Sequence, residues 1–195
     1  MLEIRVDAFA PGLAPLLRAL PRLRVPLVIT VRHPAEGGAN RLSLARRRAL
    51  FAEFLPFATL IDIELRAAAQ LAATIAEARS RGAQVIISDH HFKAMPSAAQ
   101  LWRTIHRAHS SGGDICKVAA RAETPAALAK LLSLFNARPP LALSVMGMGR
   151  FGKISRLLLA QAGSVLNYGY LDQPNASGQW EATLLKKRLA ELASD

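Results

Sequence analysis

The sequence predicts an α/β fold of the parallel barrel type. Short β-rich segments alternate with longer segments of helical apolar periodicity along the chain, and this alternation predicts parallel strands joined by helices. Several expected strands also carry charged residues at alternate positions, such as Glu3 with Arg5 and Asp62 with Glu64. Charged strand interiors are costly in an open sheet that helices cover on both faces, whereas barrel strands end in a polar active-site mouth. We therefore expect a barrel and not an open doubly wound sheet.

The expected strands and helices follow one another at regular spacing. Helix ends are marked by Gly82 and Gly112 after apolar-periodic runs, and a helix start is marked by Pro125 behind Thr124. The expected strands are residues 2–6, 26–31, 58–65, 83–88, 115–119, 141–146 and 164–170. The expected helices are residues 42–55, 66–82, 97–112, 124–135, 155–163 and 180–192. No linker interrupts the pattern, so residues 1–195 are expected to form a single domain.

Composition narrows the class of protein. Hydrophobic residues make up 51% of the 195 residues, which is typical of a globular protein. A lone cysteine, Cys116, excludes an internal disulfide, and the charged N-terminus is unlike a signal peptide. With no apolar run of membrane-spanning length, we expect a cytoplasmic protein that does not bind membranes.

The formal net charge of +11 comes from arginines scattered along the chain, and aromatic residues make up only 6%. Nucleic-acid-binding proteins cluster their basic residues and interleave aromatics with them, so this composition argues against a nucleic-acid partner. An anionic small substrate remains possible.

Lys117 and His90 are the first candidates for chemistry. Strand alternation places Lys117 on one face with Ile115 and Ala119, inside an apolar strand. Burial lowers the pKa of a lysine, and a neutral amine can attack a carbonyl to form a Schiff base. His90 shares a face with Phe92 at the end of the preceding strand and could carry protons. A snorkelling or ion-paired lysine and a structural histidine are the alternatives.

Two further segments could bind an anionic or polar ligand. Arg32 and Glu36 follow the second expected strand, where an arginine could hold a carboxylate and a glutamate could orient a histidine. The glycine-rich loop 144–156 enters a helix and ends in Arg156, so it could cradle an anion. Solvated turns are the alternative. A metal site is not expected, because His90 and His91 diverge and the sequence has no Cys/His cluster.

The joint pattern resembles a known family, the type I 3-dehydroquinate dehydratases. "EIRVD" resembles the family's Glu-x-Arg strand, "TVRHPAEGG" its Thr-x-Arg-x-x-x-Glu-Gly-Gly, and "IDIEL" its Asp-x-Glu-Leu. "SDHHF" is similar to Ser-x-His-x-Phe, "DICKVA" to the strand of the Schiff-base lysine, "GKISR" to the Gly-x-x-Ser-Arg loop, and "ASGQ" to the final Pro-Gly-Gln. The seven motifs occur in order across nearly the whole chain.

The resemblance implies a role for each matching residue. Lys117 would form the imine, His90 would be the general base and acid, and Glu36 would orient His90. The residues that would bind substrate are Glu3, Arg5, Arg32, Arg156, Asn175 and Gln179, with Arg156 and Gln179 holding the carboxylate. Two departures stand in the last motif: Ser177 replaces a proline, and Asn175 stands where a serine is common.

The resemblance also implies the activity. The chain would dehydrate 3-dehydroquinate to 3-dehydroshikimate in the shikimate pathway of aromatic amino acid biosynthesis, with no cofactor and no metal. A homodimer is the expected assembly. The alternatives are another Schiff-base barrel lyase of the class I aldolase type, which leaves Arg32, Glu36, Arg156 and Gln179 unexplained, and a catalytically impaired barrel that only binds a ligand or nucleic acid.

The count of seven expected strands raises one further expectation. A (β/α)8 barrel has eight strands, and the segment 2–6 matches the family's second strand. The family's first strand and helix have no counterpart in the 195 residues. We expect an upstream start, and the alternatives are a second chain that fills the gap or a barrel that stays open.

Overall fold

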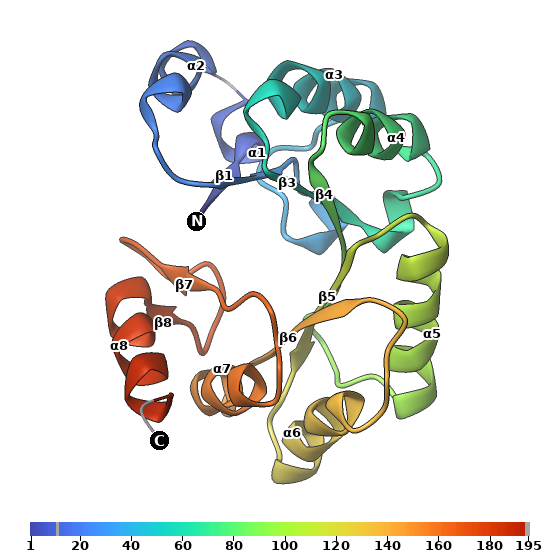
Figure 1. The fold of residues 1–195 in the computed structure, drawn as a ribbon, viewed down its shortest axis with the longest axis vertical. Coiled ribbons are helices and arrows are strands. Elements are labelled where there is room, and N and C mark those ends of the chain that lie inside the picture. Colours follow the sequence, from blue (N-terminus) through green and yellow to red (C-terminus); the bar gives the residue numbers. More distant parts are fainter. Residues whose placement is uncertain (11, 194–195) are drawn as a thin grey trace. The chain divides into compact units, whose positions relative to one another are not determined.

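The computed structural model describes residues 1–10 and 12–193, which divide into two compact units (Figure 1). The first unit comprises Met1–Asp89 and Arg107–Ile115, and the second comprises His90–His106 and Cys116–Asp195. The expected single domain over 1–195 stays a prediction. Each unit is built from parallel strands and helices in alternation, as the sequence pattern predicts, and each carries some of the candidate site residues.

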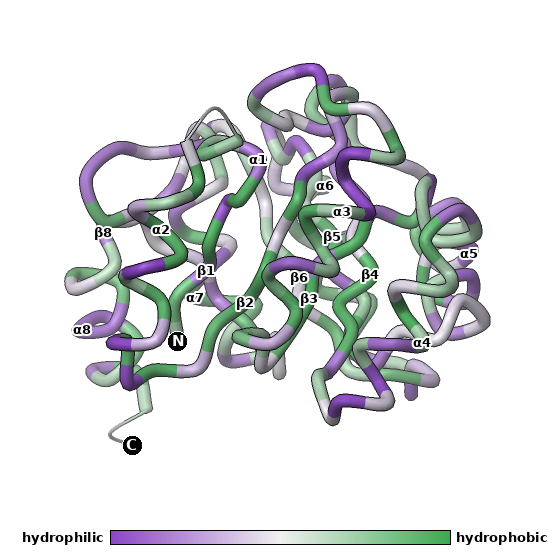
Figure 2. The backbone as a smooth tube through the Cα atoms, turned by 90° about the horizontal axis from the view of Figure 1, so that it is seen from above, coloured by the Kyte–Doolittle hydropathy of each residue, from purple (hydrophilic) through white to green (hydrophobic). Residues whose placement is uncertain are grey.

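Four parallel strands form the sheet of the first unit, in the same order as in the sequence. They are β1 (Leu2–Arg5), β2 (Leu27–Thr30), β3 (Leu60–Glu64) and β4 (Gln84–His91), the last continuing into the second unit. Leu2 pairs with Leu27, and Val28 pairs with Leu60. On β3, the register places Glu64 opposite Ser88 of β4. Strands β2, β3 and β4 consist largely of hydrophobic residues (Figure 2), and Thr30, Glu64 and Ser88 lie toward their C-terminal ends.

The helices of the first unit are short except for two. They are α1 (Val6–Phe9), α2 (Ala14–Ala19), α3 (Leu44–Phe54) and α4 (Ala72–Ser80), with 3-10 turns η1 (Leu20–Arg22), η2 (Pro34–Glu36), η3 (Leu55–Phe57) and η4 (Leu65–Ala67). Helix α3 begins behind Ser43, whose hydroxyl accepts a hydrogen bond from the amide of Arg46. It buries Leu50, Phe51 and Phe54, and it packs on β2 and α4. That buried face is spaced as a helix requires.

The second unit holds two neighbouring strands, β5 (Ile115–Arg121) and β6 (Ala142–Met148), of which Ile115 falls in the first unit. Its helices are α5 (Ala98–Ser110, which ends in the first unit), α6 (Pro125–Leu132), α7 (Gly152–Gln161) and α8 (Ala182–Leu192), with the 3-10 turn η5 (Ser133–Phe135). Helices α6 and α7 pack on β6 and on each other. The expected helix start is confirmed, because the Thr124 hydroxyl accepts from the amide of Ala127.

The predicted extent of the seventh strand, residues 164–170, is wrong. Only Gly169–Tyr170 (β7) is a strand, and it pairs with Trp180–Glu181 (β8) in a separate two-stranded sheet. In place of a regular ladder, the segment makes a backbone bond to β6, from the amide of Val165 to the carbonyl of Leu143, and side-chain bonds. The Ser164 hydroxyl accepts from the amide of Val145, and the Ser144 hydroxyl donates to the carbonyl of Leu166. Serine side chains compete with the backbone for such partners, which the apolar pattern alone does not reveal.

Two of the helices that begin later than their patterns indicate do so for a visible reason. The helix expected from residue 66 starts at Ala72, because η4 takes up the first residues of that segment. The helix expected from residue 180 starts at Ala182, because the carboxylate of Glu181 accepts hydrogen bonds from the amides of Thr183 and Leu184. A glutamate in that position ends the strand and caps the helix.

Two glycines bring the start of α7 against the loop before β8. A Cβ on Gly152 would lie 2.7 Å from the Cα of Gly178, and Gly178 itself has a φ of 78°. The atoms that approach are backbone atoms, which cannot swing away as a side-chain end can. This contact holds the loop that carries Asn175 and Gln179, two of the expected substrate-binding residues.

Replacing Gly152 by alanine should therefore destabilise the protein. Overpacking against a fixed backbone costs about 1–3 kcal/mol, which exceeds the gain in helix propensity of roughly 1 kcal/mol. Gly12→Ala is the matched control, since nothing lies within 4 Å of a Cβ built there. Thermal unfolding measures both: a Gly152→Ala melting temperature no lower than that of Gly12→Ala would contradict the close contact.

Candidate functional site

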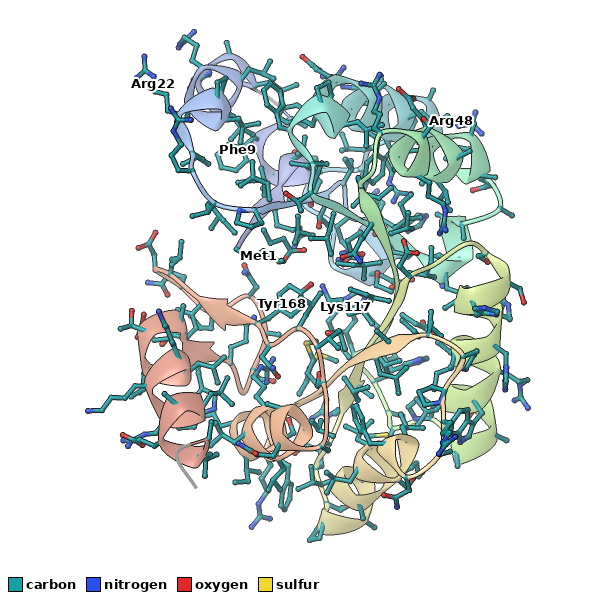
Figure 3. All side chains as sticks on the ribbon, viewed as in Figure 1. Met1, Phe9, Arg22, Arg48, Lys117 and Tyr168 are labelled. Carbon is teal, nitrogen blue, oxygen red and sulfur yellow. The ribbon has the colours of Figure 1, made fainter. Side chains whose placement is uncertain are left out.

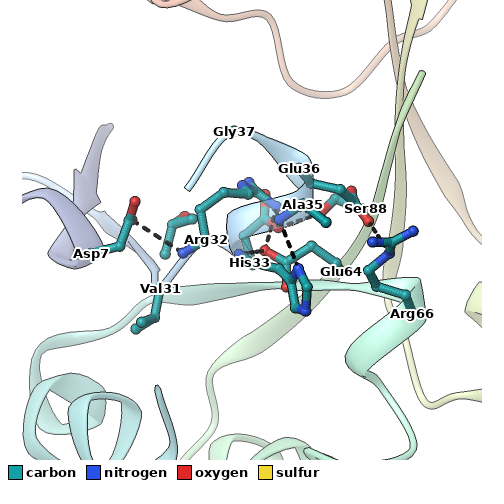
Figure 4. A network of polar contacts seen from close by, with 12 residues as sticks. Asp7, Val31, Arg32, His33, Ala35, Glu36, Gly37, Glu64, Arg66 and Ser88 are labelled. Atoms are coloured by element: carbon teal, nitrogen blue, oxygen red, sulfur yellow. Dashed lines mark hydrogen bonds and ion pairs between the residues drawn. The ribbon is translucent and has the colours of Figure 1, made fainter. Parts of the chain in front are cut away.

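A network of buried charges lies at the C-terminal ends of β2, β3 and β4 in the first unit (Figure 4). Arg32, which is 3% exposed, stands at its centre. Its Nη1 and Nη2 donate to the two carboxylate oxygens of Asp62, each at 2.9 Å, and Nη1 also donates to Glu64 Oε1 at 3.1 Å. The hydroxyl of Ser88 links Arg32 to Asp62 at 2.7 and 2.6 Å. Asp62 and Glu64, two charged strand residues seen in the sequence, thus both bind Arg32.

These carboxylates keep Arg32 charged in spite of its burial. Burial by itself lowers the pKa of the guanidinium, because the charged form loses water. The charge and hydrogen bonds of Asp62, with the charges of Glu64 and Glu3, outweigh burial and raise the pKa above the usual arginine value. Arg32 is therefore a fixed cation at any physiological pH, suited to bind a polar or anionic ligand.

Glu36 is placed by the loop that follows β2. Its 3-10 turn η2 begins behind His33, whose Nδ1 accepts a hydrogen bond from the amide of Ala35 at 3.0 Å. The loop then folds back so closely that a Cβ on Gly38 would lie 2.4 Å from the carbonyl oxygen of Arg32. Only glycine fits there. The glycines of "EGG" therefore serve to hold Glu36 beside the buried carboxylates.

The surroundings of Glu36 favour its protonated form. Its side chain is largely buried, and burial together with the negative charges of Glu64 and Asp89 raises the pKa of Glu36 to about 7. The charges of Arg32 and Arg66 oppose that shift, and Arg66 Nε lies 3.2 Å from Glu36 Oε1. A carboxyl group with a pKa near neutrality can hold or release a proton under physiological conditions.

Glu3 and Arg5 complete the candidates of the first unit. Glu3 Oε1 accepts a hydrogen bond from the Thr30 hydroxyl at 2.7 Å and lies 3.9 Å from Arg32 Nη2. Arg5 is held by Asp7, to which it donates from Nε at 3.0 Å and from Nη2 at 2.8 Å. Arg5 Nη2 also donates to the carbonyl of Gly37. Both side chains remain partly exposed, so they can contact a ligand.

In the second unit, Lys117 lies within β5 and is 4% exposed. Its Nζ lies 3.9 Å from the centroid of the Tyr168 ring, and the two side chains can be followed in Figure 3. The face of an aromatic ring stabilises an ammonium group, whereas burial favours the neutral amine. Lys117 is thus a buried amine beside an aromatic face, and its role as a Schiff-base lysine stays a prediction.

His90 lies on β4, which extends to His91 and so runs three residues beyond the expected end of this strand. The His90 ring stacks on Phe92, with ring centroids 6.0 Å apart and an interplanar angle of 14°. The predicted common face of His90 and Phe92 is confirmed.

A cavity of about 170 Å³ lies at the ends of β5 and β6. Asn175 is one of the residues that line it, so an expected substrate-binding residue does face a space for a ligand. Gln179 lies nearby in sequence, and its Oε1 accepts hydrogen bonds from the amides of Asn175 and Ala176 at 2.7 and 3.2 Å. The residues that line the cavity are Phe92, Arg121, Met148, Gly149, Asn175, Ala176 and Ser177.

Arg156 makes more hydrogen bonds within the fold than its Gly-x-x-Ser-Arg motif indicates. Its Nη1 donates to the carbonyls of Gly147, Gly152 and Gly178 at 2.7–2.9 Å, and its Nε donates to the carbonyl of Tyr168. Burial lowers the pKa of Arg156 to about 10, which still leaves the group charged at neutral pH. Its Nη2 makes no hydrogen bond within residues 1–10 and 12–193, so this nitrogen is the one through which a carboxylate could bind.

Sequence reasoning missed several residues that contact the candidate site residues of the two units or their neighbours. Tyr168 was assigned only to a strand, and no local pattern marks its place over Lys117. Asp7, Arg47 and Arg66 were not singled out either, although each binds a candidate or its neighbour. Asp62 and Glu64 were recognised as charged strand residues, but not as the partners of Arg32.

Within the described ranges, His, Cys, Asp and Glu side chains do not gather into a group of three that could hold a metal ion. In that same part of the chain, helices of the length and apolar character needed to cross a membrane are lacking.

Comparison with known proteins agrees with the motifs. The model of the family described as type I 3-dehydroquinase matches residues 1–194. A curated relative, the 3-dehydroquinate dehydratase of Hydrogenobaculum sp., is 32% identical over 184 residues, which cover 92% of this chain and 82% of that protein.

Solved structures agree as well. The crystal structure of 3-dehydroquinate dehydratase from Geobacillus kaustophilus is similar with a TM-score of 0.90 and 26% identity, over 100% of this chain and 80% of that one. A type I 3-dehydroquinate dehydratase from Clostridium difficile, with covalent modified comenic acid, has a TM-score of 0.87 and 27% identity, over 97% of this chain and 80% of that one. The α/β barrel-type fold class expected from the sequence is thereby confirmed.

Removal of the Arg66 charge should raise the pKa of Glu36 further. Arg66 opposes the effect of burial and of the two neighbouring carboxylates, so Arg66→Ala shifts the Glu36 titration upward and keeps the carboxyl protonated to higher pH. The difference should shrink at high salt, because Arg66 is about half exposed. Carbon-13 NMR titration of the glutamate carboxyls measures the shift, with Arg48→Ala as the control. A Glu36 pKa that falls in Arg66→Ala would contradict this electrostatic account.

Proposed function

Because this chain belongs to the type I 3-dehydroquinase family, we propose that Lys117 catalyses the dehydration of 3-dehydroquinate to 3-dehydroshikimate by forming an imine with the substrate. The family makes the chain a hydro-lyase that acts on a small molecule in the shikimate pathway. The observation that carries the covalent step is the buried amine of Lys117, held 3.9 Å from the Tyr168 ring centroid. The relative with covalent modified comenic acid supports it.

The proposed reaction has three steps. The amine of Lys117 attacks the ketone carbon, and loss of water gives an imine whose nitrogen withdraws electrons from the adjacent carbon. His90 removes a proton from that carbon and then donates a proton to the departing hydroxyl, which leaves as water. Water hydrolyses the imine, which releases the conjugated ketone and restores the lysine. The net change is the loss of one water molecule.

His90 and Glu36 share the proton chemistry in this proposal. The stacked imidazole of His90 supplies the general base and acid, as the resemblance assigns it. Glu36 takes the part of its orienting partner, as the resemblance assigns it, and its carboxyl, whose pKa is raised to about 7, can also hold a proton near neutral pH.

The remaining candidates bind the substrate in the proposal. Arg32, Glu3 and Arg5 contact its hydroxyl and other polar groups. Arg156 and Gln179 hold its carboxylate, and their part is supported by Arg156 Nη2 and by the Gln179 amide nitrogen, neither of which hydrogen-bonds to the described part of the chain. Asn175 offers a polar contact from the cavity wall. A cytoplasmic location and a homodimer complete the proposal.

Borohydride reduction tests the covalent step. Added together with 3-dehydroquinate, it should leave a stable adduct on the peptide that contains Lys117, located by mass spectrometry. Lys117→Ala should lose both the adduct and the rise in absorbance of the conjugated product, while Lys93→Ala, an exposed lysine, should keep both. An adduct on another lysine of the unmodified enzyme would refute the assignment.

The paired histidines should respond differently to substitution. His90→Ala should lower kcat by about 10²–10⁴-fold, the usual contribution of a positioned acid–base group. His91 follows on the opposite face of the strand, so His91→Ala serves as its control and should change kcat little. Equal losses of kcat in both variants would contradict the assignment of the acid–base role to His90 alone.

A further inference from the structure

One of three consecutive arginines on α3 is buried, and the other two are exposed. Arg47 is 1% exposed, whereas Arg46 and Arg48 lie at the surface. Arg47 shares the apolar face of the helix with Leu50 and Phe51. A guanidinium in such a place is costly unless charges and hydrogen bonds compensate for the lost water.

The compensation comes from the charge network of the first unit. Arg47 Nη2 donates to Glu64 Oε2, and Arg47 Nε donates to the carbonyl of Val31 at 2.9 Å. The other oxygen of the same carboxylate, Glu64 Oε1, accepts from Arg32 Nη1 at 3.1 Å and from the amide of His33 at 2.7 Å. Arg47 therefore bonds to the residue that precedes Arg32 and also to the carboxylate that holds Arg32 and His33.

We propose that Arg47 is a positioning residue for Arg32. Because Arg47 on α3 holds the Glu64 carboxylate at Oε2, the other oxygen, Oε1, faces the loop after β2 in one orientation. The bond from Arg47 to Val31 fixes the backbone at the point where the loop leaves β2. Together these contacts set the direction from which the Arg32 guanidinium reaches a ligand. The substrate-binding part of Arg32 rests on the proposed function, whereas the geometric claim about Glu64 and Arg32 does not.

A purely structural arginine would behave differently from a positioning one. Loss of a structural ion pair lowers the melting temperature and leaves the Michaelis constant of the folded enzyme unchanged. Loss of positioning weakens an interaction that Arg32 makes with substrate and transition state alike, which raises KM with little change in kcat. The separate effects on KM and on kcat therefore distinguish a positioning role of Arg47 from a purely structural one.

The first experiment compares Arg47→Met and Arg47→Lys with Arg46→Met. Methionine fills the space of the arginine stem without its charge, and lysine keeps the charge but loses the forked pair of donors. We expect KM to rise by about tenfold in Arg47→Met, since small misplacements of binding groups carry losses of this order or more. Arg47→Lys should fall between Arg47→Met and the unmodified enzyme, and it replaces Arg47→Met should that variant fail to fold. Arg46→Met should keep both KM and kcat.

A double-mutant cycle shows whether Arg47 acts through Arg32. In an Arg32→Ala background, the arginine that is positioned is gone, so Arg47→Met should add no further rise in KM. The same rise in both backgrounds, or an unchanged KM in Arg47→Met with only a lower melting temperature, would overturn the proposal.

A crystal structure of Arg47→Met decides the geometric claim without any turnover. The contact of Arg32 Nη1 with Glu64 Oε1 should be lost or moved, and a contact kept at 3.1 Å as in the unmodified chain would overturn the proposal. Absence of dehydratase activity in the unmodified enzyme would refute the proposed function alone. The crystal structure would then still decide the part of Arg47.

Discussion

The pairing of two buried arginines with two buried carboxylates is the constraint on which the first unit depends. Asp62 and Glu64 are fully buried on β3, and Arg32 and Arg47 approach them from the loop after β2 and from α3. A buried charge that loses its partner costs about 3–5 kcal/mol, so the strand, the loop and the helix must keep their relative register. The apolar face of α3 supplies the packing that places Arg47, and the network in turn determines the course of the loop. Packing and charge pairing here enforce the same arrangement.

The same charge network affects the protonation state of Glu36. Asp62 and Glu64 are already matched with arginines, so a third carboxyl group in the loop adds negative charge to a buried region. Its pKa accordingly rises to about 7, with burial as the largest cause and the neighbouring carboxylates next. Glu36 therefore enters any reaction near neutral pH as a group divided between its two protonation states. The close turn at Gly38 is what brings it there, which links a glycine in the sequence to the electrostatics of the site.

Much of this arrangement could be predicted from the sequence. The parts that could not be predicted have identifiable physical reasons. Alternating apolar strands and charged positions predicted the fold class and the location of Lys117 on its strand, whereas His90 was expected just after a strand that in fact extends to His91. The run "ARRR" does not reveal which arginine is buried, because that depends on the rotation of α3 against β2. The segment 164–170 has the composition of a strand, yet hydrogen bonds of Ser164 and Ser144 with distant backbone groups replace the ladder. Such bonds join residues about twenty positions apart, beyond the reach of a local pattern.

Arg156 shows how one side chain can serve both the fold and a site. Three carbonyls around Nη1 and one at Nε hold the start of α7, the end of β6 and the loop at Gly178 together. Burial lowers the pKa of Arg156 to about 10, so the positive charge persists at neutral pH. The nitrogen that remains, Nη2, has its position fixed by the bonds of the others. A guanidinium held in this way has lost its conformational freedom before a ligand arrives, which lowers the entropic cost of binding an anion. The structural bonds of Arg156 thus prepare the carboxylate contact proposed for it.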